Sequence, residues 1–167
     1  SAFGTCNDLP WSCGDPLGYQ GYDYETVQIG LQCWFAENLR AENYRNGEAL
    51  VSGLLDAEWT ATNSGASAQN GEGEALYNWF SVNDSRGICP VGWSVPADID
   101  WAMLESIAGV PQEEIYTSGF RGSASEAGNK LKAQDQWAGE GLDTYGFHAT
   151  PSGFRSSSNG LLQHVGD

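Results

Sequence analysis

The sequence has few positive charges, two histidines and one methionine, and each shortage narrows what the protein can do. Lysine and arginine together number 7 among 167 residues, against 22 aspartates and glutamates, so the formal net charge is -15. Binding nucleic acid or an anionic membrane surface would bring like charges together. The sequence also contains no long apolar stretch of the kind that spans a bilayer. We therefore expect no nucleic-acid partner and no membrane insertion.

Catalytic patterns are equally scarce. The histidines, His148 and His164, stand in no motif that would supply a Ser-His-Asp or Cys-His arrangement. Asp98 and Asp100 lie close enough to act as an acid and base pair, but they are better explained as carboxylates at a helix N-terminus, where the helix dipole favours them. The sequence has no D-x-[DN]-x-[DN]-G calcium loop. We expect no enzyme, no catalytic residues and no cofactor; calcium stays possible on acidity alone, with its ligands unknown.

Four cysteines without the close CxxC pairs of a zinc site indicate two disulfides and an oxidising compartment. Cys6 and Cys13 are spaced to close a small N-terminal loop around Trp11. A disulfide-bonded, acidic chain of this kind is expected to be secreted or to lie on the outer cell surface.

Aromatic residues and glycine dominate what remains. The chain has 7 Trp, 7 Tyr, 6 Phe and 22 Gly. This composition favours aromatic rings packed in a core and joined by many loops, as in a loop-rich β or α+β domain. We expect one domain over residues 1–167, with an irregular segment at 1–21.

The most informative stretch runs from Gly87 to Leu104. Pro90 and Pro96 bracket an extended segment that directs Trp93 inward, because neither proline fits inside a helix. A helix should begin just after Pro96 and end before Gly109. Its apolar stripe consists of Trp101, Leu104 and Ala108, flanked by Met103 and Ile107.

The other expected elements follow from local patterns and turn residues. The region 46–73 is a polar excursion, in which 63–71 should be exposed or mobile. The remaining expectations are a strand at Tyr22–Ile29, helical turns at Trp34–Leu39 and Leu54–Trp59, a helix at Glu74–Val82, a glycine- and serine-rich loop at 112–129 and a strand at Thr144–Thr150.

Three motifs resemble the Fibrobacter succinogenes major paralogous domain family. The run Cys89-Pro90-Val91-Gly92-Trp93 to Leu104 is similar to its C-P-x-G-W-x-x-P-x-D-x-x-W-x-x-L signature. Residues 24–39, with Trp34 and Asn38, resemble its opening motif, and Gly146-Phe147 with Pro151 to Arg155 resembles its closing element. The motifs span roughly residues 20–155 in the right order. The structural motif residues are thus Trp34, Asn38, Pro90, Trp93, Pro96, Trp101, Gly146, Phe147, Pro151 and Arg155.

The resemblance implies an architecture and a disulfide. Motif order is similar to that of the C-type-lectin-like and formylglycine-generating-enzyme-like group, which predicts an α+β fold with two short helices and a small twisted antiparallel sheet. Because Cys33 and Cys89 each lie inside a family motif, the resemblance implies that they pair, with Cys6 and Cys13 as the second disulfide. Family members have a small hydroxyl residue where Ala97 stands, so here the helix start must use Asp98 or go uncapped. Relatives of this bacterial family also continue to a closing strand, which this sequence lacks after Asp167.

The family resemblance predicts the fold more firmly than the function, because one fold hosts many functions. The first expectation is a non-catalytic extracellular module for adhesion that binds a glycan or a protein at a cell surface. Trp59 and Trp11 lie in polar loops and are the candidates for stacking on a sugar, although tryptophan more often packs on a core. The alternative is a structural subunit of an appendage or filament, assembled by strand donation at an open sheet edge.

Overall fold

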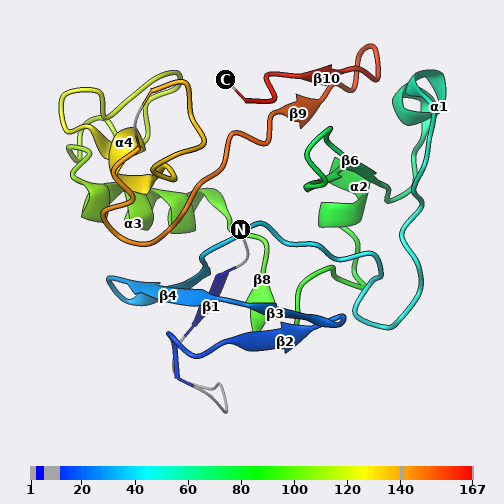
Figure 1. Cartoon of the computed structure of the whole chain (residues 1–167), viewed down its shortest axis with the longest axis horizontal. Coiled ribbons are helices and arrows are strands. Elements are labelled where there is room, and N and C mark those ends of the chain that lie inside the picture. Colours follow the sequence, from blue (N-terminus) through cyan, green and yellow to red (C-terminus); the bar gives the residue numbers. More distant parts are fainter. Residues whose placement is uncertain (1–2, 6–11, 140, 167) are drawn as a thin grey trace.

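Figure 1 shows the computed structural model, which describes residues 3–5, 12–139 and 141–166. It combines short helices with small antiparallel sheets, as the α+β expectation requires. The largest sheet has the strand order β4 (Thr26–Ile29), β5 (Gln32–Phe35), β1 (Phe3–Thr5) and β8 (Trp93–Ser94), with every neighbouring pair antiparallel. Three hairpins accompany it: β2 (Leu17–Tyr19) with β3 (Tyr22–Tyr24), β6 (Ser67–Gln69) with β7 (Ala75–Tyr77), and β9 (Phe154–Arg155) with β10 (Leu162–Gln163).

Four helices are present in the described residues, where the sequence predicted two. They are α1 (Asp56–Ala61), α2 (Trp79–Val82), α3 (Asp98–Ala108) and α4 (Ala127–Leu131). In Figure 1, α3 and α4 lie together on one side of the molecule, whereas α1, α2 and the β6–β7 hairpin lie on the other. No helix among the described residues has the length and apolar character needed to cross a membrane.

Strand β5 is buried on both faces, and its alternating side chains divide the core. Cys33 and Phe35 share one face, where the Phe35 ring stacks on Tyr24 with centroids 4.5 Å apart. Trp34 lies on the opposite face and packs in a separate cluster with Leu104 of α3. The strand therefore joins the sheet core to the helix that forms the candidate site.

Helix α3 begins and ends where the sequence predicts. It stops at Gly109, whose φ of 101° lies in the left-handed region that glycine adopts at low cost. Its start uses Asp100 rather than the expected Asp98, because the Asp100 carboxylate reaches back and accepts a hydrogen bond from the Ala97 N–H at 2.8 Å. That contact supplies half of a capping box at a position where alanine has no side-chain acceptor.

Both expected disulfide pairings are wrong. Cys33 is bonded to Cys13, with their Cα atoms 5.9 Å apart, and Cys89 is a buried free thiol among the described residues. Since Cys13 is already taken, the pairing of Cys6 with Cys13 is excluded as well; Cys6 itself lies outside the described residues. Burial raises the pKa of the Cys89 thiol to about 11, so it stays protonated at neutral pH.

Hydrogen bonds made by Thr26, the first residue of β4, account for the observed pairing. The Thr26 hydroxyl accepts a hydrogen bond from the Gly14 N–H at 2.9 Å and donates one to the Asp15 carbonyl at 2.8 Å. These two bonds hold the segment that follows Cys13 against β4, beside Cys33 of the neighbouring strand. The motif resemblance carried no information about this segment.

Several element assignments also differ from the expectation. Gln32–Phe35 forms a strand where a helical turn was expected from Trp34, and Ala75–Tyr77 is strand β7 where a helix was expected. Asn78 starts α2 instead, because its side chain accepts the Ser81 N–H at 3.0 Å. Thr144–Thr150 is not a strand and contributes a single bridge, between Ala149 and Lys132.

The segment 63–71 is ordered rather than exposed throughout. It contains strand β6, and Ala66 and Asn70 within it are buried. The Asn70 side chain accepts the backbone N–H groups of Glu72 and Glu74, at 3.0 and 2.9 Å. This asparagine turn joins β6 to β7 through polar contacts, which the hydrophobic content of the segment does not report.

Candidate binding site

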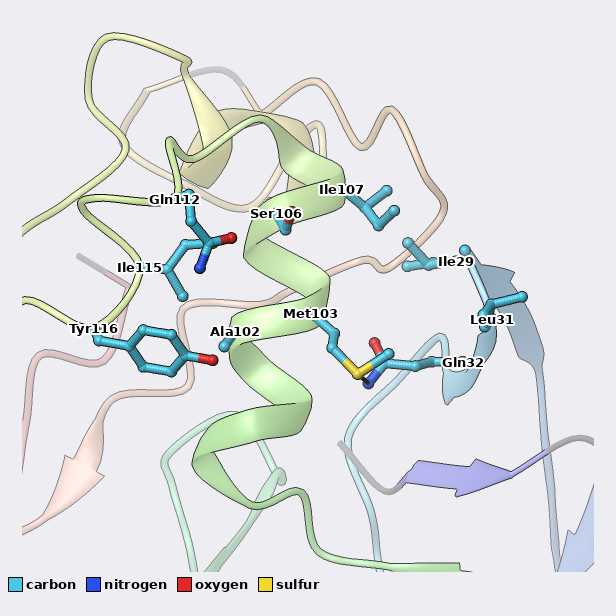
Figure 2. A pocket seen from close by; sticks show the side chains of 11 residues that line it. Ile29, Leu31, Gln32, Ala102, Met103, Ser106, Ile107, Gln112, Ile115 and Tyr116 are labelled. Atoms are coloured by element: carbon cyan, nitrogen blue, oxygen red, sulfur yellow. Dashed lines mark hydrogen bonds between the residues drawn. The ribbon is translucent and has the colours of Figure 1, made fainter.

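An apolar pocket of about 300 Å³ lies between helix α3 and the turn that joins β4 to β5 (Figure 2). The chain that follows α3 closes its third side. The residues that line it are Ile29, Gly30, Leu31, Gln32, Ala102, Met103, Ser106, Ile107, Gln112, Ile115 and Tyr116. Its size lies at the lower end of the range of ~300–1,000 Å³ for small-molecule sites, which suits a single side chain.

Two glycines bring the three walls together. Gly30 turns the chain between β4 and β5 with φ of 62°, and a Cβ there would lie 3.1 Å from the Ile107 side chain. Glycine is therefore required both by the turn and by the approach to α3. Gly109 ends α3, after which the chain turns back so that Ile115, itself buried, packs beneath the pocket.

The walls are apolar and the rim is exposed. Ile29, Ala102 and Ile115 are buried, whereas Met103, Ile107 and Tyr116 are exposed apolar or aromatic side chains. Met103 and Ile107 are the residues expected to flank the buried stripe of α3, and they do so. Figure 2 shows Ile107 directed toward Ile29 and Met103 directed toward Gln32, so these pairs bridge the helix and the turn.

Gln32 is the one polar residue of the pocket that is almost wholly buried, at 2% exposure. Its Nε2 donates a hydrogen bond to the Asp100 carbonyl at 3.1 Å and lies 3.8 Å from the Met103 sulfur. Its Oε1 is buried with no hydrogen-bond partner among the described residues. The signal in the sequence is a glutamine within an otherwise apolar strand, next to Cys33 and Trp34.

The pocket lies in a strongly acidic part of the chain. Residues 87–120 contain five carboxylates and no lysine or arginine. Glu105 is paired with Arg121 at 2.7 Å, and Glu114 accepts the Gly122 N–H at 3.0 Å. Asp98 and Glu113 are exposed.

A polar network lies elsewhere, where three distant segments meet. The Asn38 amide donates to Glu74, Thr150 and Ser152, and the Asn70 amide donates to Glu74 and to the Ser152 carbonyl. Burial raises the pKa of Glu74, but hydrogen bonds from Ser152, Thr150, Asn70 and Asn38 outweigh it and the pKa is lowered overall. These groups satisfy one another's hydrogen bonds, so the network holds the three segments in contact.

The motif residues are also mostly structural. Trp34, Trp93 and Phe147 are buried, Trp101 is half-buried against Trp34, and Gly146 turns the chain with φ of 68°. The Arg155 guanidinium donates to the Leu54 carbonyl and lies over the Trp59 ring at 4.6 Å. The remaining motif residues are Asn38, Pro90, Pro96 and Pro151, of which Asn38 lies in the network above.

Trp59, one of the two predicted sugar-stacking tryptophans, is not exposed. Trp59 is only 6% exposed because Arg155 covers its ring, so it cannot serve as a sugar platform. Trp11 lies outside the described residues. Trp79 is 68% exposed, and it begins the short helix α2 within the range where a longer helix was expected.

Within the described residues, no cluster of three or more His, Cys, Asp or Glu side chains could hold a metal ion. His148 is half-buried, and its Nδ1 lies 3.2 Å from an Asp143 carboxylate oxygen. Asp143 also accepts the His148 N–H at 2.8 Å, which holds this residue at φ of 53°. The pair therefore fixes a loop.

Comparison with known families and structures places the chain in one family. The model of the Fibrobacter succinogenes major domain matches residues 27–164. The chain belongs to this family. No curated protein and no solved structure gave a match. The family domain thus contains the whole pocket, the polar network and the three sequence motifs, except for residues 24–26 of the first.

Proposed function

We propose that this Fibrobacter succinogenes major domain is a non-catalytic extracellular recognition module that binds a partner protein through the pocket at α3. The observation that carries the proposal is the apolar pocket itself, with Met103, Ile107 and Tyr116 exposed around a buried floor. Exposed apolar side chains gathered at a pocket typically mark an interaction site. The Cys13–Cys33 disulfide supports an extracellular location. A lectin-like arrangement of the elements belongs to the same proposal.

Selection of peptides tests this function. A random peptide library displayed on phage is selected on the immobilised protein, and enriched peptides are expected to share an apolar anchor residue. Ile107→Lys should abolish their binding by placing a charge at the pocket. Val91→Lys is the matched control, because Val91 is 79% exposed and does not line the pocket. Equal loss of binding in both variants, or no loss in either, would contradict the proposal.

A glycan ligand is the second candidate, and one observation favours it. The exposed indole of Trp79 stands at a cavity of about 530 Å³ that is also lined by Asn83, Ser94 and Asp98. An open aromatic face beside amide, hydroxyl and carboxylate groups is suited to stacking and hydrogen bonding with a sugar. A glycan array with the wild type and Trp79→Ala decides: binding that Trp79→Ala removes would support this candidate over the protein partner.

A further inference from the structure

The buried carbonyl oxygen of Gln32 restricts the chemistry of whatever enters the α3 pocket. This oxygen has no hydrogen-bond partner among the described residues, and the residue is 2% exposed. A buried acceptor without a donor is unfavourable, so a ligand that brings a donor gains from pairing with it. The amide orientation is fixed by the neighbouring bond, because Nε2 must face the Asp100 carbonyl.

The surroundings of this oxygen favour a group that donates and does not accept. Gln32 shares this part of the pocket with the apolar Ile29 and with Met103, whose sulfur lies near Nε2, and the Gln32 N–H is already directed to Asp100. Gln112 and Tyr116, which could donate, lie on the opposite side of α3 in Figure 2. A hydroxyl would leave its own lone pairs without donors, whereas an indole N–H is a donor only.

Met103 lies beside the Gln32 amide at the rim of the pocket. Its sulfur lies 3.8 Å from the Gln32 amide, and the side chain is 42% exposed at the rim. Methionine is unbranched and changes rotamer readily, so it can turn aside and then pack against an aromatic ring. The ring enters where the thioether now lies.

The negative charge of the protein indicates which kind of molecule supplies the indole. The chain as a whole carries a formal net charge of -15, and Asp98 and Glu113 are exposed on the segment that contains α3, so the protein attracts positive charge. A polypeptide that presents a tryptophan between basic residues matches both the pocket and its surroundings. We infer that the α3 pocket binds the tryptophan side chain of a basic segment in a partner protein, with the indole N–H donating to Gln32 Oε1. This inference rests on the proposed protein-binding function.

Peptides that differ at one atom test the hydrogen bond. The full chain, labelled with 15N, is titrated with Lys-Lys-Trp-Lys-Lys and with the same peptide containing 1-methyltryptophan, and amide shifts of residues 29–32 and 102–107 are followed by NMR. Methylation should weaken binding about five- to tenfold, because the donor is lost. Gln32→Leu should bind both peptides equally. Gln134→Leu, the same substitution at an exposed glutamine outside the pocket, should keep the wild-type preference.

Each outcome bears on a different claim. Equal binding of the two peptides by the wild type would overturn the hydrogen bond while leaving apolar capture intact. Failure of both peptides to shift these amides would overturn the proposed function at this pocket. Binding of N-acetyltryptophanamide as tightly as the basic peptide, or of a glutamate-flanked peptide as tightly as a lysine-flanked one at low salt, would overturn the basic polypeptide as the occupant. Spectral dispersion of Gln32→Leu reports whether that variant is folded.

Discussion

Cys13 and Cys33 are joined by a disulfide that connects the N-terminal segment to the central strand of the main sheet. The bond closes a loop over a sequence separation of 20 residues. In the chain-entropy model a loop of this length stabilises the fold by about 3 kcal/mol, because it restricts the unfolded chain.

Removing this disulfide should therefore lower the stability substantially. We expect Cys13→Ala with Cys33→Ala to reduce the free energy of unfolding by about 3 kcal/mol, measured by urea denaturation. Non-reducing peptide mapping should recover the peptides of Cys13 and Cys33 joined to each other. Recovery of Cys33 joined to Cys89 would contradict the structure.

Truncation of two tryptophans to alanine should change the free energy of unfolding by very different amounts. Trp93 is buried with its ring centroid 4.4 Å from that of Phe35, whereas Trp79 is 68% exposed. Trp93→Ala should cost about 3–5 kcal/mol through lost packing and a cavity, and Trp79→Ala should stay within about 0.5 kcal/mol. Thermal unfolding of both variants provides the measurement. A large loss from Trp79→Ala would show that its indole is packed in solution.

The sequence predicted the parts of the fold in which local signals and burial agree. Pro96, the spaced apolar residues and Gly109 defined α3, and the prolines around Trp93 placed that indole in the core. Failures occurred where a polar contact between distant residues decides the structure. Asn70 builds the β6–β7 hairpin by bonding backbone groups, and the Thr26 hydroxyl positions the segment that follows Cys13.

Only part of the candidate site could be predicted from the sequence. Met103 and Ile107 flank the predicted stripe of α3, so their exposure could be expected from helical periodicity. The pocket also needs Gly30 to approach Ile107 and the chain after Gly109 to return, and both are long-range contacts. The unpaired acceptor of Gln32 depends on atomic neighbours, which periodicity does not report.

The Asp100 carboxylate offers a local test of the start of α3. It accepts the Ala97 N–H at 2.8 Å, and no side chain at Ala97 can cap the helix. Asp100→Ala should reduce stability by about 1 kcal/mol, and Asp100→Asn should retain part of that contribution. Ala97→Ser adds the missing cap acceptor and should stabilise the protein by about 1 kcal/mol. Chemical denaturation compares the three variants, and an unchanged Ala97→Ser would argue against an open cap position.

Glu74 should make the fold sensitive to acid. Its pKa in the folded state is lowered from the reference value of 4.5, because hydrogen bonds to the ionised carboxylate outweigh its desolvation. A carboxyl group with a lowered folded pKa contributes its full stability above the unfolded value and loses it as the pH falls through the folded value. The contribution of Glu74 is thus fully present above pH 4.5 and is lost as the pH falls from there through the lowered folded pKa.

Glu74→Gln should accordingly lower stability at neutral pH, and the difference from the wild type should shrink as the pH falls below 4.5 and through the lowered folded pKa of Glu74, where the wild-type carboxyl is itself protonated. The measurement is the free energy of unfolding from urea titrations between pH 7 and pH 3. Glu113→Gln is the control, because Glu113 is exposed and lies outside the Asn38 network. A difference between wild type and Glu74→Gln that stays constant across this range would show that the network does not depend on the charge of Glu74.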